Sequence, residues 1–344
     1  MKILAIETSC DETGVAVLEV KNGKFKIKNN LISSQVKLHQ KYGGVHPSLA
    51  KREHQKNLPL LIKKVSHNKI DLIGVTTGPG LDPCLWVGVN FAKDLAKKLK
   101  TPLVPVNHIE AHILANFINR GLSSIKFPAV CLVVSGGHTQ LILMKGIGKY
   151  RILGETRDDA AGECFDKIAR ILGIGYPGGP AVAEQARQYS LKIKNLKLKI
   201  SLPRPMIHQK NYDFSFSGLK TAVLYDFKNR KPKERRSKKY IQAMCHEAQQ
   251  AIIDVLIKKT LKAAKNYKAK SIILGGGVVA NNELRKQLEE KTEKEIPYSK
   301  TYIPASELCT DNALMAGVAA YFNRGKKKNW KKIKADANLR IDTK

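Results

Sequence analysis

The stretch "NHIEAH", residues 107–112, places two histidines four residues apart with a glutamate between them. On a helix, residues four apart share one face, so His108 and His112 are able to bind one metal ion. Glu110 lies about 200° round the helix from His108, at about 100° per residue, and so points away from that ion. In the zinc-protease pattern HExxH, the glutamate directly follows the first histidine and serves as the base. The segment therefore disfavours a protease and leaves two interpretations, namely part of a metal site or a pair of ordinary core or surface histidines.

A metal site needs a third ligand, and the stretch "SELCTDNALMAG", residues 306–317, offers Asp311. Asp311 and Asn312 open a predicted helix, for which Thr310 is a candidate N-cap. The alternative is an acidic residue that the helix dipole favours at any helix N-terminus. Both interpretations of Asp311 stay open at this level.

Three glycine turns have the form of phosphate-binding loops: "VVSGGHT" (133–139), "YPGGP" (176–180) and "LGGGVVANN" (274–282). Glycine lets backbone amides approach an anion closely. The third turn also follows a predicted strand and precedes a predicted helix, as nucleotide loops do. None matches G-x-G-x-x-G or G-x-x-x-x-G-K-[ST], which argues against a dinucleotide-binding fold and a P-loop. Together the turns favour a nucleotide site, although each alone also fits an ordinary tight turn.

Two adjacent carboxylates, Asp11 and Glu12, lie in the turn of the first predicted hairpin. Beside bound phosphates they would repel unless a cation, a water or an amine lay between them. They are therefore candidate functional residues, with simple turn formation as the alternative.

The elements that must position these residues alternate between strands and helices, which indicates an α/β fold. The segment "KILAIET", its polar turn "SCDET" and "GVAVLEV" have the same form as "AVCLVV", "SGGHT" and "QLILM". This weak internal repeat predicts two lobes with related starts. The stretch 189–212 is basic and interrupted by proline, which predicts an insertion or an irregular crossing. Helical spacing predicts helices at 47–67 (kinked or divided at Pro59), 84–99, 160–172 and 240–265.

The most unusual feature of the composition is its charge. The chain has 61 Lys and Arg but only 29 Asp and Glu, which gives a net charge of +32. Such a surface attracts polyanions by neutralising phosphates and releasing counterions. A generally lysine-rich, solvated surface explains the same excess equally well. Part of the charge is clustered in two runs, 228–239 and 326–334, which are predicted to lie in loops or tails.

With 344 residues and 43% apolar residues, the chain suits two lobes with real cores. No apolar run reaches the roughly 18 residues that a membrane span needs, and the opening "MKILAIETSC" is no secretory signal. The six cysteines are all solitary, which predicts reduced thiols in a cytoplasmic protein.

Nine motifs follow one another along the chain: "IETSCDETGVAV", "SSQVKLHQKYGGVHPSLAKREH", "TTGPGL", "NHIEAH", "LVVSGGHTQL", "DDAAGECFDKIARILGIGYPGGP", "DFSFSGLKT", "GGGVVANNELR" and "CTDNALMAG". Through these motifs, most of the chain resembles the bacterial-type tRNA N6-adenosine threonylcarbamoyltransferase family, formerly called the glycoprotease or sialoglycoprotein endopeptidase family. The resemblance implies an actin/Hsp70/sugar-kinase-like fold, with two related α/β lobes flanking a nucleotide- and metal-binding cleft. We expect an N-terminal lobe at 1–125, against which 300–344 packs back, and a C-terminal lobe at 126–299 with a basic insertion around 189–240.

The resemblance also implies roles for particular residues. His108, His112 and Asp311 match the family's metal ligands, for iron or zinc. Asp11 and Glu12 match acidic positions near the reacting group. The nucleotide and substrate contacts fall on Val133, Val134, Ser135, Gly136, Gly137, Asp166, Gly179 and Asn281.

The sequence departs from the family pattern at a few positions, none of which is a metal or nucleotide position. Asp82 and Pro83 stand where small apolar residues are usual, and His46 and Lys51 stand where an apolar residue and a serine are usual. The basic run 228–239 is also unusually dense. We expect these departures to affect partner surfaces and the approach of tRNA more than the chemistry.

The implied reaction is transfer of the threonylcarbamoyl group from threonylcarbamoyl-adenylate to the exocyclic amine of adenosine 37 in tRNAs that read ANN codons, with release of AMP. The implied partners are tRNA, a catalytically silent paralogue and a small ATPase. The alternative is an ATPase or small-molecule kinase of the same fold, against which the His/His/Asp trio argues because phosphoryl transfer prefers oxygen-ligated magnesium. A non-catalytic RNA-binding scaffold would explain the charge but not the trio.

Overall fold

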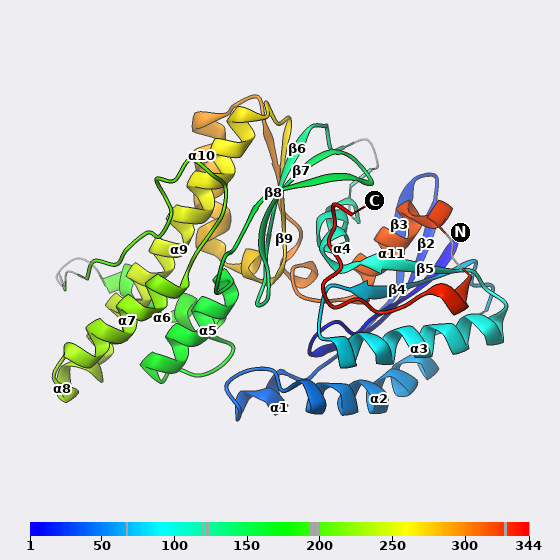
Figure 1. Cartoon of the computed structure of the whole chain (residues 1–344), viewed down its shortest axis with the longest axis horizontal. Coiled ribbons are helices and arrows are strands. Elements are labelled where there is room, and N and C mark those ends of the chain that lie inside the picture. Colours follow the sequence, from blue (N-terminus) through cyan, green and yellow to red (C-terminus); the bar gives the residue numbers. More distant parts are fainter. Residues whose placement is uncertain are drawn as a thin grey trace.

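The computed structural model describes residues 1–66, 68–118, 120–121, 124–192, 198, 200–326 and 329–343. Two α/β lobes lie side by side, each built on one five-stranded sheet (Figure 1). The strand orders are β3-β2-β1-β4-β5 and β10-β9-β6-β7-β8. Read from the opposite edge, the second order repeats the first, so the internal repeat predicted from the two hairpin starts is confirmed.

The first sheet begins with three antiparallel strands, after which β4 and β5 join in parallel. Its strands are β1 (Lys2–Glu7), β2 (Glu12–Lys21), β3 (Lys24–Ser34), β4 (Leu72–Gly78) and β5 (Leu103–Asn107). Both faces of β1 are buried, which explains its nearly continuous apolar sequence.

The second sheet has the same plan, with an antiparallel meander followed by two parallel strands. Its strands are β6 (Ala129–Val134), β7 (Thr139–Gly146), β8 (Lys149–Glu155), β9 (Ser271–Gly275) and β10 (Lys300–Tyr302).

Side chains alternate along β1 and so divide the first lobe into two layers of core. Leu4 and Ile6 belong to the cluster that packs under α2 (Pro47–Lys63) and α3 (Asp82–Leu99). Ile3 and Ala5 face the opposite layer, which contains α11 (Ala313–Phe322). The end of the chain therefore returns to the first sheet.

The helix α4 (His108–Leu114) is completely buried where the two sheets approach each other. Its apolar residues share one core cluster with Cys131 and Val133 of β6 and with residues of α11. A single apolar layer therefore joins the lobes and holds α4 between them.

The second lobe carries most of its helices on the other face of its sheet. The longest, α9 (Lys238–Asn266), supplies a series of buried residues to that core. Around it are α5 (Ala161–Leu172), α6 (Gly178–Lys192), α7 (Ser217–Asn229), α8 (Pro232–Arg235) and α10 (Asn282–Glu295). The remaining short elements are α1 (Val36–Gln40) and the 3-10 turns Ala115–Phe117, Gly277–Ala280, Ser306–Leu308, Arg324–Lys326 and Trp330–Lys332.

Of the two alternatives predicted at Pro59, a kink or a division, the division is excluded, because α2 runs without interruption from Pro47 to Lys63. Leu58, Leu61 and Ile62 are buried in the first lobe. Their packing outweighs the one backbone hydrogen bond that proline removes.

The predicted Thr310 cap was wrong. The N-cap of α11 is Asn312, whose side chain accepts a hydrogen bond from the amide of Met315. Asp311 therefore precedes the helix instead of opening it. Asp82 and Pro83, the departures from the family pattern, form the first turn of α3, where an acid and a proline suit a helix N-terminus.

The basic run 228–239 is largely helical and not a loop, because it spans the end of α7, all of α8 and the start of α9. Arg230 in this run pairs with Asp226 and Glu234. The second run falls partly outside the described residues, as does the stretch 189–212, whose described part is the end of α6 and irregular chain after residue 200.

All six cysteines are free, as predicted, and all but Cys10 are buried. Among the helices of the described residues, none has the length and apolar character needed to cross a membrane.

Candidate active site

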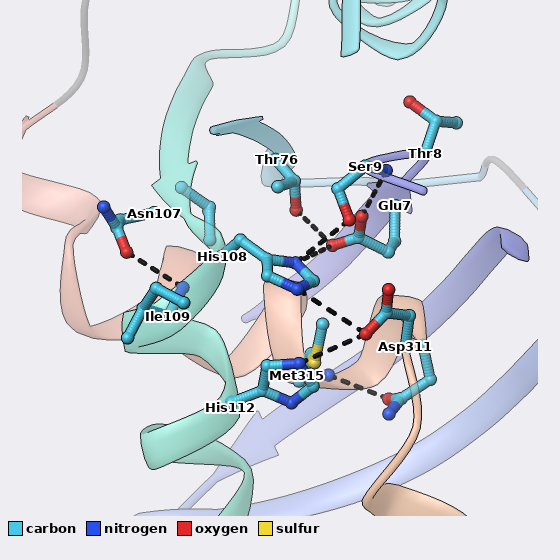
Figure 2. A network of polar contacts seen from close by, with 12 residues as sticks. Glu7, Thr8, Ser9, Thr76, Asn107, His108, Ile109, His112, Asp311 and Met315 are labelled. Atoms are coloured by element: carbon cyan, nitrogen blue, oxygen red, sulfur yellow. Dashed lines mark hydrogen bonds and ion pairs between the residues drawn. The ribbon is translucent and has the colours of Figure 1, made fainter. Parts of the chain in front are cut away.

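The two histidines of the opening motif lie on α4, directly after β5. Asn107 caps this helix, because its side-chain oxygen accepts hydrogen bonds from the amides of Ile109 and Glu110. His108 is the first residue of the helix and His112 lies one turn further on, so both rings point to the same side, as Figure 2 shows. Both are buried, with 5% and 1% of their surface exposed.

Asp311 approaches the two histidines from the segment that precedes α11 (Figure 2). Its Oδ1 atom lies 3.5 Å from Nε2 of His108 and 3.1 Å from Nε2 of His112. One ligand atom from each of the three residues lies within 4.8 Å of the other two. The structure thus brings together the three residues predicted from the sequence and forms a possible His/Asp metal site.

The donor set suits a transition metal. Both ring nitrogens of His112 are buried. Among the described residues, Nδ1 has no hydrogen-bond partner, and Nε2 lies 3.1 Å from Oδ1 of Asp311. A buried imidazole nitrogen and a buried carboxylate oxygen at this distance suit joint coordination of one ion. Two imidazole nitrogens and one carboxylate oxygen with open positions fit zinc or ferrous iron.

Glu110 is not part of this cluster. Its Oε2 atom accepts a hydrogen bond from Asn323, which lies beyond the end of α11. The predicted orientation of Glu110 away from the histidine pair is confirmed, and the cluster has no glutamate in the position of a protease base.

Behind His108 lies a carboxylate that the sequence did not single out, Glu7 at the end of β1. Glu7 is fully buried and accepts hydrogen bonds from the Ser9 amide at 2.7 Å and the Thr76 hydroxyl at 2.6 Å. Its Oε2 atom lies 3.4 Å from Nδ1 of His108, and the Ser9 hydroxyl lies 3.1 Å from the same nitrogen. These contacts favour a proton on Nδ1, which leaves Nε2 free to face Asp311.

The charges around the cluster shift its titration. Burial acts to lower the pKa of His108, but the carboxylates of Asp311 and Glu7 outweigh it and raise that pKa to about 9. Burial likewise acts to raise the pKa of Asp311, yet the two imidazoles hold it far below its usual range. The buried carboxylates therefore favour the protonated form of His108, and the imidazoles favour the ionised form of Asp311.

The third glycine turn lies directly against α4. A Cβ atom on Gly275, at the end of β9, would lie 2.9 Å from the carbonyl oxygen of His112. Gly276 has φ +95°, and a Cβ there would collide with the carbonyl oxygen of Val134 at the end of β6. Glycine at both positions allows the ends of β6 and β9 and the histidine helix to meet.

The first glycine turn, Ser135–His138, connects β6 to β7 beside this point. The Ser135 amide donates to the carbonyl of His138, and the His138 amide donates to the Ser135 hydroxyl, which closes the turn. Among the described residues, apart from the adjoining residues of the chain, no atom lies within 4 Å of a Cβ built on Gly136 or Gly137. The outer side of the turn is thus open to a ligand.

His138 in this turn was not predicted. Burial, with His108 and His112 nearby, lowers its pKa to about 4. A neutral imidazole therefore lies near the His/Asp cluster at neutral pH. The sequence could have indicated His138 as a site residue, because it lies in the glycine turn "SGGHT".

The second glycine turn is held by Asp166 of α5. The Gly178 amide donates to Oδ1 of Asp166 at 2.6 Å, and a Cβ on Gly178 would overlap the Asp166 backbone. The neighbouring Gly179 faces open space. Asp166 therefore shapes the turn in which Gly179 is exposed to a ligand.

Asn281 lies where the third turn enters α10. Its side-chain oxygen caps the helix by accepting from the amides of Glu283 and Leu284, and its amide donates to Gln249. A strand, a glycine turn and a helix therefore follow one another, as predicted. Asn281 fixes the start of that helix.

Asp11 lies in the turn between β1 and β2, as predicted, whereas Glu12 is already the first residue of β2 and pairs with Ser34 of β3. Burial, together with the charges of Asp11 and Asp311, raises the pKa of Glu12 to about 10, although the Ser34 hydroxyl donates to it. Glu12 is thus neutral at pH 7. The lobes also touch near this edge, where the Arg170 guanidinium of α5 donates to the carbonyl of Gly43.

Two similar lobes, glycine turns at the ends of paired strands and a His/Asp cluster beside them define an enzyme of the actin/Hsp70/sugar-kinase-like fold. Solved structures agree with this fold. The crystal structure of HypF from T. kodakarensis is similar, with a TM-score of 0.57 and 17% sequence identity. The match covers 94% of this chain and 47% of the HypF chain. A second HypF structure, in phosphate- and nucleotide-bound form, has a TM-score of 0.55 and 14% identity, covering 96% of this chain and 47% of its own.

Sequence relatives identify the family. The family model described as tRNA N6-adenosine threonylcarbamoyltransferase matches residues 26–318. The protein of that name from Syntrophomonas wolfei is 44% identical, over 94% of this chain and 92% of its own length. The protein of that name from Thermosipho africanus is 46% identical, over 93% of this chain and 94% of its own length. The chain belongs to the tRNA N6-adenosine threonylcarbamoyltransferase family, and it is a tRNA-modifying transferase; a kinase is not favoured.

Proposed function

We propose that the chain transfers the threonylcarbamoyl group from threonylcarbamoyl-adenylate to the exocyclic amine of adenosine 37 in tRNAs that read ANN codons. The observation that carries the proposal is the convergence of His108, His112 and Asp311 next to the glycine turn at Gly275. A metal site and an anion-binding glycine turn at one point suit a substrate that combines an acyl group with a phosphate.

We assign the metal to iron or zinc, held by Nε2 of both histidines and the carboxylate of Asp311. When bound, such an ion supplies Lewis-acid polarisation of a carbonyl oxygen, which is worth several kcal/mol in metal enzymes. Glu7 and Ser9 orient the His108 ring from behind.

The adenylate is proposed to lie along the glycine turns. The backbone amides of Gly136 and Gly137 and the hydroxyl of Ser135 face the phosphate, since the Ser135 amide already donates to His138. Val133 and Val134 are fully buried at the end of β6 and support the turn from beneath. Gly179, positioned by Asp166, and Asn281 bound the nucleotide on its other sides. The open space beside Gly136, Gly137 and Gly179 supports this placement.

The amine of adenosine is a poor nucleophile, because its lone pair is delocalised into the ring. Its nitrogen attacks the carbamoyl carbon, the bond from that carbon to the phosphate oxygen breaks, and AMP leaves. We assign to Asp11 the uptake of the proton that the amine loses, with neutral Glu12 beside it as a hydrogen-bond donor. Holding the reactants in this geometry supplies much of the remaining rate.

The target adenosine lies in a loop of tRNA, so it can be turned out of its stack at low cost. A net charge of +32 suits docking of the RNA backbone.

We further propose a cytoplasmic location, a division of the lobes near residue 125, and two protein partners, a catalytically silent paralogue and a small ATPase.

The test is mass spectrometry of the nucleosides of an ANN-reading tRNA transcript after incubation with the metal-loaded chain and the adenylate, with and without candidate partners. The proposal expects the threonylcarbamoyl mass increment on adenosine 37 and none when that position is guanosine. Absence of the increment under every condition in which a curated relative produces it would reject the proposal.

A further inference from the structure

A second feature of the chain lies at the opposite end of the second sheet from the glycine turns. There a pocket of about 790 Å³ opens where α9 ends and where β6, β9 and β10 begin. Figure 1 shows the end of α9 and the start of β9 at the top of this lobe. We call it the basal lysine pocket, and its lining residues are Lys126, Lys265, Lys268, Lys270, Tyr298, Lys300 and Tyr302.

The pocket has a rigid backbone frame. The Lys270 amide donates to the carbonyl of Pro128, and the Lys300 amide donates to the carbonyl of Lys270. The Lys126 amide donates to the Ser271 hydroxyl, which donates back to the carbonyl of Lys126. Three separate segments of the chain are thus fixed to one another, which fixes the backbone positions of Lys126, Lys270 and Lys300.

The charge of this pocket is not balanced by the protein. Lys265 pairs with Glu295 at 2.6 Å. Lys126, Lys268, Lys270 and Lys300 are exposed and form no ion pair with any carboxylate of the described residues. Like charges held together repel, and an anion bound between them would relieve that repulsion.

We propose that the basal lysine pocket binds the phosphate backbone of the tRNA substrate, remote from the modified base. This inference rests on the proposed function. Lysine offers point charges suited to phosphates without reading sequence. The ring of Tyr298, 58% exposed, adds a flat apolar surface at the rim, suited to a ribose or an unstacked base.

The distance fits one RNA molecule. Because β6 and β9 are parallel, the pocket lies at their start and the turns at Ser135 and Gly276 lie after their ends. The six residues of β6 span about 20 Å. At roughly 3.4 Å per step along a strand, about six nucleotides cover that distance, so one arm of a tRNA reaches both places.

The test compares two triple variants of the full chain that lose the same charge. The pocket variant carries Lys268→Gln, Lys270→Gln and Lys300→Gln, which remove three unpaired lysines of the pocket. The hairpin variant carries Lys21→Gln, Lys24→Gln and Lys26→Gln, which remove three exposed lysines from the β2–β3 hairpin of the first lobe. The dissociation constant of an unmodified ANN-reading tRNA transcript is measured from 50 to 300 mM salt, and thermal unfolding verifies that each variant folds.

The pocket variant is expected to bind tRNA on the order of tenfold more weakly, with a salt slope lower by roughly 2 to 3, because each lost phosphate contact removes about one unit. The hairpin variant is expected to keep the wild-type slope. Equal losses in both variants, or no loss in the pocket variant, would overturn the proposal in favour of diffuse charge. Binding of pyrophosphate to the wild type that the pocket variant loses, with tRNA affinity unchanged, would overturn it in favour of a small anion.

The outcome separates this inference from the proposed function. If the pocket variant binds tRNA weakly while the wild type binds it but modifies nothing, the inference stands and the proposed function falls. If the wild type modifies adenosine 37 and the pocket variant does so with an unchanged KM for tRNA, the proposed function stands and the inference falls.

Discussion

Glu7 Oε2 lies 3.4 Å from Nδ1 of His108, on the side of the ring opposite Asp311. A fully buried carboxylate thus stands behind a candidate metal ligand. Carboxylates in this position fix the tautomer and orientation of a ligating histidine and raise its basicity. Thr76 and the Ser9 amide hold the carboxylate itself in place.

Replacing Glu7 with glutamine is expected to lower metal affinity by about 10- to 100-fold, because the amide cannot match the carboxylate as an acceptor from His108. Competition with a chromophoric chelator measures the affinity. Glu19→Gln, which removes an exposed carboxylate paired with Lys28, is the control and should bind metal as the wild type does. Unchanged affinity in the Glu7 variant would mean that the contact has no part in binding.

Asn107→Ala should destabilise the protein by about 0.5–2 kcal/mol, because α4 loses its N-cap. The Asn107 side chain also donates to the carbonyl of Leu339, so the C-terminal segment loses an anchor. Denaturant unfolding with linear extrapolation gives the free energy. Asn329→Ala, which removes the cap of a short exposed 3-10 turn, is the control; an equally small change in both variants would contradict the importance of the α4 cap.

Glu12 predicts a pH dependence of stability. Its pKa in the folded chain is about 10, above the ordinary value of 4.5, so between these values the folded state binds more protons than the unfolded state. Stability from this group is therefore lost as pH rises, and Glu12→Gln should flatten the decline between pH 6 and 9. The free energy of unfolding, determined at several pH values between 6 and 9, measures this decline. Glu19→Gln should leave the decline as it is, and a Glu12 variant as steep as the wild type would refute the assignment.

The glycine turns predict opposite outcomes at two positions. Gly276→Ala should destabilise the protein strongly, because φ is +95° and the added Cβ would collide with the Val134 carbonyl. Gly136→Ala should fold normally, because no atom lies within 4 Å of its Cβ, yet it should weaken binding of a non-hydrolysable adenylate analogue. Thermal unfolding and calorimetric titration distinguish these effects. Full affinity in a folded Gly136 variant would remove the turn from the nucleotide site.

Local patterns allowed the sequence to predict the two hairpin starts, the long α9 helix and the placement of His108 and His112 on one helical face. The same patterns could not join distant segments. Nothing in the spacing of Asp311 shows that its strand-to-helix segment returns to α4, and only the family resemblance indicated it. A division of the helix at Pro59 stood among the predictions because propensity ignores the packing of Leu58 and Leu61.

Glu7 shows what a closer inspection of the sequence could have found. A lone acid within the apolar strand "KILAIET" costs free energy unless it has partners. Those partners, Thr76 and His108, come from β4 and α4, which the sequence could not place beside β1. The anomaly was visible, but its explanation depends on the tertiary structure.

Metal stoichiometry tests the central claim most directly. The wild-type chain, purified without affinity metal and dialysed against excess iron or zinc and then metal-free buffer, is analysed by elemental mass spectrometry beside Asp311→Ala and the control Asp82→Ala. We predict one ion per chain in the wild type and the control, and near none in the Asp311 variant. Retention of a full equivalent by the Asp311 variant, or a wild type that binds none, would contradict the account.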